Sequence, residues 1–482
     1  MNMRTLRIGS TVLVAAILVV ACGGKDAGTG SGAPVGGGSC SVDSQKQFVL
    51  SAAREWYLFP ELLPTTIDPA SFATVTQFLD ALTATARAQS RDRFFSYATS
   101  IQAEQALLGS GESAGFGFSV LTRTATLQAF LAQVFEGSAA ADAGLARGDE
   151  ILAVGTSAAT LQSVATLLAT PDGLTNAFGP STAGTARTLR WRDVAGTTFE
   201  REVVKRTFTI TPVPAAQVRL IPRAGLAPIG HLTLRTFIST SDAQLRAAFD
   251  TFRQNNVRDV IIDLRYNGGG LVSTAELLLN LLGGTNTNAV SYATQLNTAK
   301  ASQAETIRFR QQSETIPTLR IAFVTTGQSA SASELVINSM FPYAQVAVVG
   351  ERSFGKPVGQ FAFDVASCDF RLRLVSFRSV NRNGEGDYYT GLPSAAFTAG
   401  GGASCAATDD LTRLPGDTAE GMTAEALFWL NNNRCTGPAI ADSGGAVQGG
   451  GSGLQKTSAM AGFEPANRPE PNDFQILVPG GY

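Results

Sequence analysis

The sequence predicts a multidomain α/β protein built around a core of parallel strands and helices. The chain has 482 residues, more than one compact domain usually holds. Residues 206–435 alternate apolar strand-like runs with helix-like runs, as chains with parallel sheets do. A helix-like stretch and then short strands around glycine-rich turns precede them. We therefore expect an N-terminal helical subdomain over 41–110, an inserted β-rich domain over 111–205 and the α/β core over 206–435.

Composition narrows the class of protein. Apolar residues make up 44% of the chain and the net charge is −2, values typical of globular domains. No basic surface is indicated, so we expect no nucleic-acid partner.

The first 22 residues are typical of a targeting segment. Arg4 and Arg7 precede an apolar run over 8–20, which is too short to span a bilayer comfortably. The run ends at Cys22 in a pattern similar to the lipobox of bacterial lipoproteins. That resemblance implies cleavage before Cys22, acylation of this cysteine and a lipid anchor in the bacterial cell envelope. Gly23 follows, not aspartate, which favours the outer membrane, with the protein facing the periplasm or the exterior; an ordinary secretory signal is the alternative.

Residues 23–39 are mostly Gly, Ser, Ala and Thr, the composition of a flexible tether. Four cysteines lie beyond it, and an oxidising envelope favours two disulfides, for which three pairings exist. We predict Cys368 with Cys405 and Cys40 with Cys435. No C-x-x-C occurs and the other ligands are missing, so we predict no metal site.

The N-terminal subdomain is predicted to be helical. QKQFVLSAAREWYLF and SFATVTQFLDALTATARA have apolar residues three and four positions apart. Leu63-Pro64 and TTIDP separate the two predicted helices.

Residues 111–205 read as short strands: GFGFSVLTR, LQAFLAQVF, and a further strand in AGLARGDEILAV. This region resembles a PDZ domain of the bacterial protease type, with a generic glycine-rich hairpin as the alternative. PDZ domains add an extended peptide to a sheet edge and bind its terminal carboxylate with backbone N–H groups. The resemblance implies that one loop binds protein or peptide substrates with a free C-terminus. This loop consists of Gly115, Phe116, Gly117 and Phe118.

The core region alternates four predicted strands, in IGHLTLRTF, DVIIDLRYNGGG, LRIAFVTTG and AQVAVVGE, with three predicted helices, SDAQLRAAFDTFRQN, LVSTAELLLNLL and SASELVINSMF. Sites in such sheets form at the carboxyl ends of strands. Two stretches containing glycine lie at such ends.

The first of these stretches is Asn267 followed by glycines 268–270, where the backbone is expected to approach another group closely. A phosphate loop would need GKS, GKT or G-x-G-x-x-G, none of which is present there. Backbone N–H groups at a helix N-terminus also suit an oxyanion.

The second stretch is GQSASASELVINSM, residues 327–340. Ser331 and Glu334 have the S-x-x-E form of a capping box, so the serines can serve only to cap a helix. A serine nucleophile would need a base instead. The single histidine, His231, lies in an apolar strand far along the chain, where we interpret it as a strand residue.

A lysine offers the alternative base. Lys356 follows a strand and a glycine turn, and it and Lys300 are the only lysines between Arg206 and Cys435. Arginine keeps its proton at neutral pH, whereas burial lowers the pKa of a lysine enough for it to act as a general base.

Together, VIIDLRYNGGG, TTGQSASASELV and VVGERSFGKPVGQ, downstream of a PDZ-like insert, resemble the carboxyl-terminal processing proteases, serine peptidases of family S41 with a Ser-Lys pair. The resemblance covers about 41–435 and implies a ClpP/crotonase-like layered core. It implies a nucleophile, a base and a residue that orients the base, which are Ser331, Lys356 and Gln360. It also implies an oxyanion hole formed by N–H groups of Ala332 and Gly269, with Gly268 as the neighbouring donor.

The sequence departs from the family pattern at three places. Gly268 stands where relatives often have proline, and Pro357 replaces the usual glycine after the lysine. FPYA at 341–344 lacks the acidic residue that many relatives have there. Glu334 is therefore the candidate supporting carboxylate.

The implied function is a serine endopeptidase that cleaves envelope proteins near or from their C-termini without a metal or organic cofactor. One alternative is a non-catalytic peptide-binding lipoprotein on the same scaffold. Another is a structural lipoprotein whose serines only cap a helix. The tail over 436–482 is rich in Gly and Pro, which predicts disorder, with a role as an anchor or a self-substrate.

Overall fold

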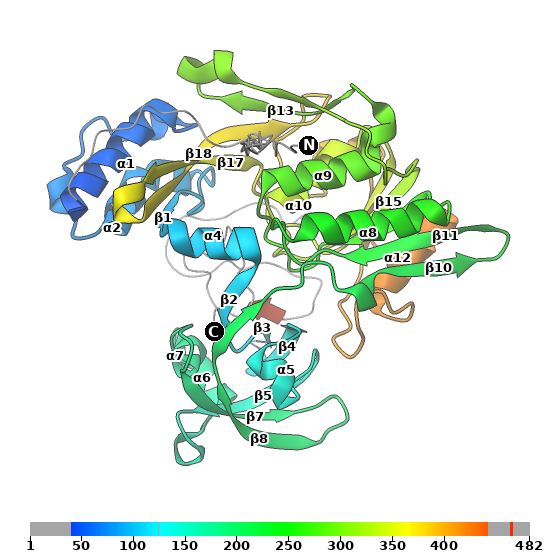
Figure 1. The fold of residues 1–482 in the computed structure, drawn as a ribbon, viewed down its shortest axis with the longest axis horizontal. Helices are drawn as coiled ribbons and strands as arrows, with labels where there is room; N and C mark the ends of the chain where they lie inside the picture. Colours follow the sequence, from blue (N-terminus) through cyan, green and yellow to red (C-terminus); the bar gives the residue numbers. More distant parts are fainter. Residues whose placement is uncertain (1–39, 124, 442–462, 466–482) are drawn as a thin grey trace, which may run out of the picture.

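The computed structural model describes residues 40–123, 125–441 and 463–465. The predicted signal segment, Cys22 and the tether lie outside these residues. Figure 1 shows N-terminal helices on one side, a β-rich domain projecting below, and a layered α/β core. The multidomain α/β class predicted from the sequence is confirmed. Within the described residues, every helix is too short or too polar to cross a membrane.

The N-terminal helices share their core with a sheet from the far end of the chain. Val49, Ala53 and Trp56 lie three or four positions apart on α1 and are buried. They pack against β17 and β18, so this region is not an isolated subdomain. The helices are α1 (Val42–Trp56), α2 (Val75–Leu82), α3 (Ala84–Ala88) and α4 (Ile101–Ser110). The sheet has β1 (Tyr97–Thr99), β13 (Val290–Leu296), β14 (Thr306–Arg308), β17 (Val358–Val365) and β18 (Phe370–Val380).

The chain enters and leaves the β-rich domain through two paired strands. β2 (Glu112–Gly115) runs antiparallel to β9 (Arg206–Thr209). Between them, strands in the order β3-β4-β5-β7-β8 enclose an apolar core. The strands are β3 (Phe118–Arg123), β4 (Gln128–Val134), β5 (Glu150–Gly155), β6 (Gln162–Ser163), β7 (Ala186–Arg192) and β8 (Thr198–Val204), and the helices are α5 (Ala139–Ala143), α6 (Val164–Leu168) and α7 (Gly173–Phe178).

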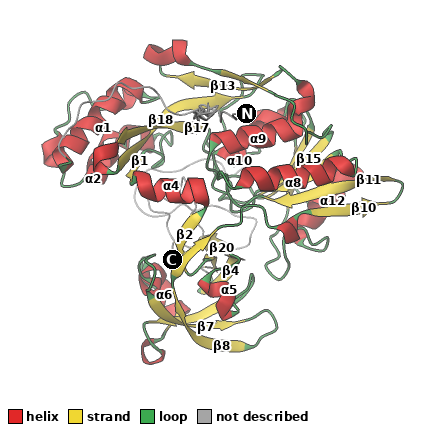
Figure 2. Ribbon diagram, viewed as in Figure 1, coloured by secondary structure: helices red, strands yellow, loops and turns green. Residues whose placement is uncertain are grey.

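The core sheet has the order β10-β11-β12-β15-β16-β19, and its strands from β11 to β19 are parallel. Both faces are covered, as the unbroken apolar run of β12 suggests. Val260 and Ile262 face α8, α9 and α10, while Ile261 faces α12. The strands are β10 (Arg219–Arg223), β11 (Leu226–Thr233), β12 (Asp259–Asp263), β15 (Arg320–Thr325), β16 (Gln345–Gly350) and β19 (Ala403–Ala406). The helices are α8 (Ser241–Gln254), α9 (Val272–Gly283), α10 (Ala332–Met340), α11 (Ala395–Ala399) and α12 (Gly421–Asn432); Figure 2 shows these layers.

The predicted disulfide pairing is wrong, although all four cysteines form disulfides. The bonds join Cys40 to Cys368 and Cys405 to Cys435. Cys368 lies in the turn between β17 and β18, and the start of α1, next to Cys40, packs against this part of the sheet. Cys405 in β19 packs against α12, the helix that ends just before Cys435. Docking of elements, which cysteine spacing does not report, decides the pairing. Glu425 lies within ligand distance of Cys405 and Cys435, but the disulfide removes both thiolates.

Candidate active site

Ser331 occupies the turn between β15 and the first residue of α10. Its backbone has φ 57° and ψ −114°, a conformation that costs free energy for a residue other than glycine. Ser331 is half-buried, whereas Ser329 and Ser333 are fully buried. The Ser329 hydroxyl donates to the carbonyl of Leu264 (2.7 Å), and that of Ser333 to the carbonyl of Asn267 (2.9 Å). The two flanking serines therefore hold the turn, whereas the side chain of Ser331 accepts the backbone N–H of Glu334 at the start of α10.

Glu334 connects the serine turn to the lysine turn. The predicted capping box is present, and the Glu334 carboxylate accepts the N–H of Ser331 at 3.0 Å. The same oxygen accepts the N–H of Lys356 at 2.7 Å. The other oxygen accepts the Gly355 N–H at 2.6 Å and the Ser353 hydroxyl at 2.5 Å. Burial raises the pKa of Glu334, but these four donors oppose that effect and require the carboxylate as an acceptor.

Lys356 is buried, with 2% of its surface exposed. Desolvation lowers the pKa of Lys356 to about 7, although Asp92 and Glu334 oppose this change. Its Nζ lies 3.3 Å from Oε1 of Gln360 and 5.3 Å from the centre of the Phe95 ring. The amine is therefore available in its neutral form near neutral pH, as a general base requires.

The N-terminal segment completes the surroundings of the lysine, which the sequence did not suggest. Gln360 Nε2 donates to the carbonyl of Phe95 at 2.8 Å, which turns Oε1 toward Lys356. The buried Asp92 accepts the Phe95 N–H at 2.7 Å. Arg93 donates to the carbonyls of the lysine turn at residues 354 and 355. The only signal in the sequence is the charged and aromatic run RDRFF.

Gly269 lies against the serine turn. A side chain there would place Cβ 2.8 Å from Cβ of Ser331 and 3.0 Å from the Ala332 nitrogen, and φ is +109°. The predicted donors differ in availability, because the Gly269 N–H donates to Oδ1 of Asn267 at 2.9 Å. Among the hydrogen bonds of the described residues, none uses the N–H of Gly268 or of Ala332. These two amides are the donors left for an oxyanion.

Family profiles match both halves of this arrangement. The profile described as Peptidase family S41 matches residues 228–390, which hold the glycine loop, the serine turn and Lys356. The profile described as Peptidase S41 N-terminal domain matches residues 44–97, which hold Asp92 and Phe95. These matches assign residues 44–97 and 228–390 to domains of peptidase family S41.

Individual S41 relatives match shorter segments. The chain is 28% identical over 134 residues to the carboxy-terminal processing protease CtpA of Bacillus subtilis, covering 28% of this chain and 27% of that protein. It is 26% identical over 180 residues to the chloroplastic C-terminal processing peptidase of Tetradesmus obliquus, covering 34% and 35%. The matches thus span about a quarter to a third of these relatives. The crystal structure of an S41 protease candidate from Bacteroides fragilis shares the fold with a TM-score of 0.60, at 23% identity, over 80% of this chain and 97% of that one.

The single histidine of the sequence is a strand residue, as predicted. His231 is buried in β11, and its Nδ1 lies 3.0 Å from the carbonyl oxygen of Gln217. Its Nε2 is 3.9 Å from a carboxylate oxygen of Asp263. It makes no hydrogen bond to the serine turn in the part of the chain that the structure describes.

A buried network of ion pairs and hydrogen bonds holds the residues that precede the glycine loop. Arg265 donates to Asp263 at 2.9 Å and to Glu420 at 2.8 Å. Asp409 accepts hydrogen bonds from Arg265, from the hydroxyl of Tyr266 and from Arg147 of the β-rich domain. Burial raises the pKa of Asp263, but the charge of Arg265 and the interactions with His231 together more than offset this effect, and the pKa lies below its usual value. The network joins the β-rich domain to the residues just before the loop.

The loop predicted to bind a carboxylate lies between β2 and β3. Phe116 and Phe118 are buried, and their rings stack at 5.4 Å inside the domain core. Gly117 has φ +86° and lies against Ser138, where a side chain would overlap Cβ of that serine. The aromatic side chains are thus structural, and a binding role rests on the backbone N–H groups alone.

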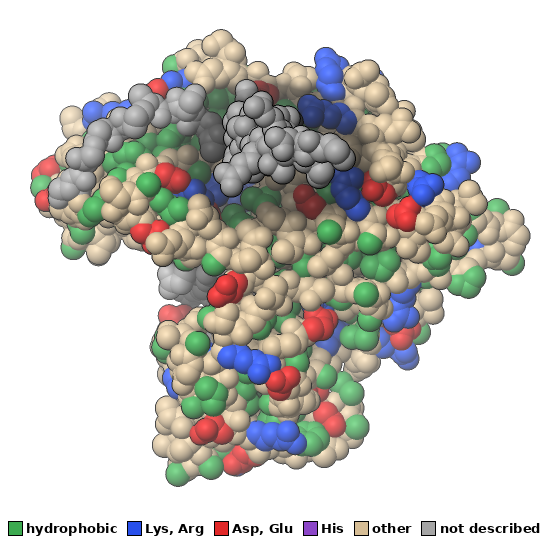
Figure 3. All heavy atoms as spheres, viewed as in Figure 1, with side chains coloured by type: hydrophobic (Ala, Val, Ile, Leu, Met, Phe, Trp, Pro, Cys, Tyr) green, Lys and Arg blue, Asp and Glu red, His purple; other side chains and the backbone are tan. Residues whose placement is uncertain are grey.

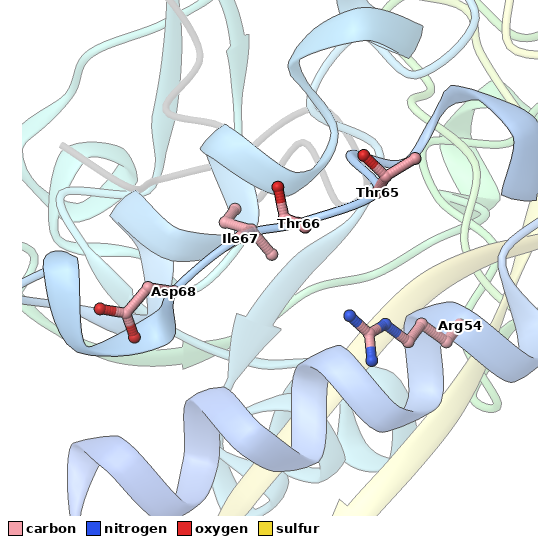
Figure 4. A pocket seen from close by; sticks show the side chains of 5 residues that line it. All are labelled: Arg54, Thr65, Thr66, Ile67 and Asp68. Carbon is pink, nitrogen blue, oxygen red and sulfur yellow. The ribbon is translucent and has the colours of Figure 1, made fainter.

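A surface depression lies in the N-terminal region of the structure. This depression of about 480 Å³ is lined by Arg54, Thr65, Thr66, Ile67 and Asp68, all in the N-terminal region (Figure 4). It contains none of the predicted site residues. Figure 3 shows acidic and basic side chains scattered over one face without a single-sign patch.

Proposed function

We propose that this chain is a serine endopeptidase that uses Ser331 as nucleophile and Lys356 as general base. The observation that carries the proposal is the buried amine of Lys356, whose pKa is about 7. The backbone N–H groups of Lys356 and Ser331 donate to the same oxygen of Glu334, which ties the two turns together. An ordinary exposed lysine would be almost wholly protonated at neutral pH and unable to accept a proton. The positive φ of Ser331 and its only partial burial, beside two fully buried serines, fit a nucleophile better than a simple cap.

The reaction begins when neutral Lys356 takes the proton of the Ser331 hydroxyl as Oγ attacks a peptide carbonyl. The N–H groups of Ala332 and Gly268 stabilise the oxyanion, with Gly269 able to contribute if its bond to Asn267 is exchanged. Protonated Lys356 then gives its proton to the leaving amine. Water attacks the acyl enzyme while Lys356 takes one of its protons, and Lys356 then gives that proton to Oγ of Ser331 as the acyl C–O bond breaks and the carboxylic acid product leaves.

The proposed substrates are proteins of the bacterial envelope, cut near or from their C-termini. The names of the relatives from Bacillus subtilis and Tetradesmus obliquus, both C-terminal processing enzymes, support cleavage at C-termini, and the predicted lipoprotein signal supports envelope substrates. In the proposal the β-rich domain acts as a PDZ domain, and the backbone of residues 115–118 binds the substrate carboxylate. The chain would be anchored by lipid on Cys22, most simply in the outer membrane. Replacing Cys22 with Ser should release the protein from the membrane fraction, and continued membrane association would refute the anchor.

The decisive test is cleavage of an unfolded model protein with a nonpolar C-terminus by residues 40–482. Ser331→Ala and Lys356→Ala should abolish cleavage while circular dichroism stays unchanged. Lys300→Ala is the matched control, because Lys300 is the other lysine of this region and pairs with Glu55 near the surface. If the wild type cleaves nothing between about pH 6 and 9 but binds C-terminal peptides, the chain is a binding protein on this scaffold. Residual cleavage by Ser331→Ala would contradict the assigned nucleophile.

A further inference from the structure

A short strand near the C-terminus joins the sheet of the β-rich domain. β20 (Phe463–Pro465) pairs antiparallel with β3, opposite Arg123, Thr122 and Leu121 in turn. Without β20, β3 would be the edge strand of that sheet. The pairing therefore occupies an edge that would otherwise present unpaired backbone groups (Figure 2).

The occupied edge is the one that a substrate peptide would use under the proposed function. The loop of residues 115–118 leads directly into β3 (Phe118–Arg123). Because β20 is antiparallel to β3, it runs from Arg123 toward Leu121, and so toward that loop. A peptide whose terminal carboxylate is bound by the loop would take the same edge in the same direction. The tail strand and such a peptide cannot both be present.

Strand β3, with which β20 pairs, also contacts a residue next to the glycine loop of the candidate active site. Leu121 lies opposite Pro465 and is 2% exposed. It packs in a small apolar cluster with Ala132, Leu411 and Tyr266. Tyr266 immediately precedes Asn267 and the glycine loop. The β3 edge is thus linked through Leu121 and Tyr266 to the segment that leads into the glycine loop.

The covalent connection between the core and β20 favours pairing of β20 with β3 of the same chain. The chain is held on the core up to Ala441, since Ile440 donates to Ser404 at 3.0 Å and Arg352 to the carbonyl of Ala441 at 3.4 Å. Residues 442–462 then join this anchor to β20. Because β20 belongs to the same chain as β3, its pairing is intramolecular and has a high effective concentration. A free peptide must bind the edge well enough to overcome that competition.

We propose that residues 463–465 are an internal ligand of the β3 edge, which substrates must displace before they can bind there. The inference rests on the proposed function, because it assigns the same edge to substrates. The tail lowers binding and cleavage of substrates that need the edge, and a competing peptide with higher affinity releases it.

The first test is independent of catalysis. Thr122 and Glu464 are paired residues, so Thr122→Cys with Glu464→Cys should form a disulfide on mild oxidation, detected by mass spectrometry of a non-reduced digest. Thr122→Cys with Ala459→Cys is the control, since residue 459 lies outside β20. We expect at least a tenfold preference for the 122–464 pair. Equal cross-linking of the two pairs, or none, would overturn the pairing.

The second test measures competition. Phe463→Pro with Glu464→Pro removes two backbone donors from β20, and Gln455→Pro with Lys456→Pro is the matched control in the same tail. In a Ser331→Ala background, fluorescence anisotropy should show at least tenfold tighter binding of a labelled peptide with a nonpolar C-terminus for the 463/464 variant only. With Ser331 present, the same variant should cleave such substrates faster. If the 463/464 variant binds the peptide more tightly but no variant cleaves substrate, the inference is supported and the proposed peptidase activity is refuted. If the 463/464 variant binds and cleaves as the wild type does, only the inference is refuted.

Discussion

Replacing Gln360 with Glu should move the pH dependence of cleavage toward alkaline pH. The change places a carboxylate oxygen where Oε1 now lies, 3.3 Å from Nζ of Lys356. Two unit charges at that distance interact by about 5 kcal/mol at an effective dielectric constant of 20. Part of this is lost because the variant can no longer donate to the Phe95 carbonyl. We expect the pKa of Lys356 to rise from about 7 by roughly two to three units, at about 1.4 kcal/mol per unit.

The assay is kcat/KM for an unfolded model substrate between pH 5.5 and 10.5. The wild type should gain activity as the pH rises through about 7, because the base must be neutral. Gln360→Glu should be about 50- to 500-fold slower at pH 7 and recover most of the loss near pH 10. Gln295→Glu, at an exposed position in the neighbouring β13, should behave as wild type. A midpoint that stays near pH 7 with uniformly reduced activity would refute Lys356 as the titrating base.

Three further predictions concern the same turns. Lys356→Met should raise the free energy of unfolding at pH 7 by up to about 5 kcal/mol. The folded pKa of about 7 lies below the unfolded value of 10.5, so the wild type gains stability as the pH rises between these values. Urea titrations should therefore show that the stability advantage of the variant shrinks as the pH rises from 7 to 10.5. Gly269→Ala should abolish cleavage, since Cβ would lie 2.8 Å from Cβ of Ser331, whereas Gly401→Ala, also at positive φ but with open space around it, should leave cleavage intact. Glu334→Gln should abolish cleavage and lower stability by about 2–4 kcal/mol in thermal unfolding, because an amide nitrogen would face backbone donors, while the exposed Glu305→Gln should be neutral.

The parallel core was predictable because its signals are local. The run VIIDL is apolar without interruption, and β12 is buried on both faces, toward α8–α10 and toward α12. The serine turn was also predictable, since Ser331 and Glu334 are three residues apart and form their capping box within one helical turn. Patterns of this kind depend on neighbours along the chain.

The surroundings of the lysine were not predictable because they join distant segments. Gln360 donates to the carbonyl of Phe95, 265 residues earlier. The disulfide between Cys40 and Cys368 spans 328 residues, and its pairing follows the docking of α1 on β17 and β18. The antiparallel sheet that contains these two strands likewise assembles from segments far apart in sequence.

This long-range assembly bears directly on the chemistry. The amine of Lys356 is neutral near pH 7 only because it is desolvated, and Phe95 from the N-terminal region lies over it at 5.3 Å. Phe95 in turn is held by Asp92, and Arg93 binds the carbonyls of the lysine turn. If the N-terminal region undocks, water reaches Nζ and the pKa returns toward 10.5, so the base is protonated at neutral pH. Under the proposed mechanism, the α/β core alone would then keep its serine turn and glycine loop but lose its base, so the N-terminal region would act as part of the active site and not only as a cover for the core.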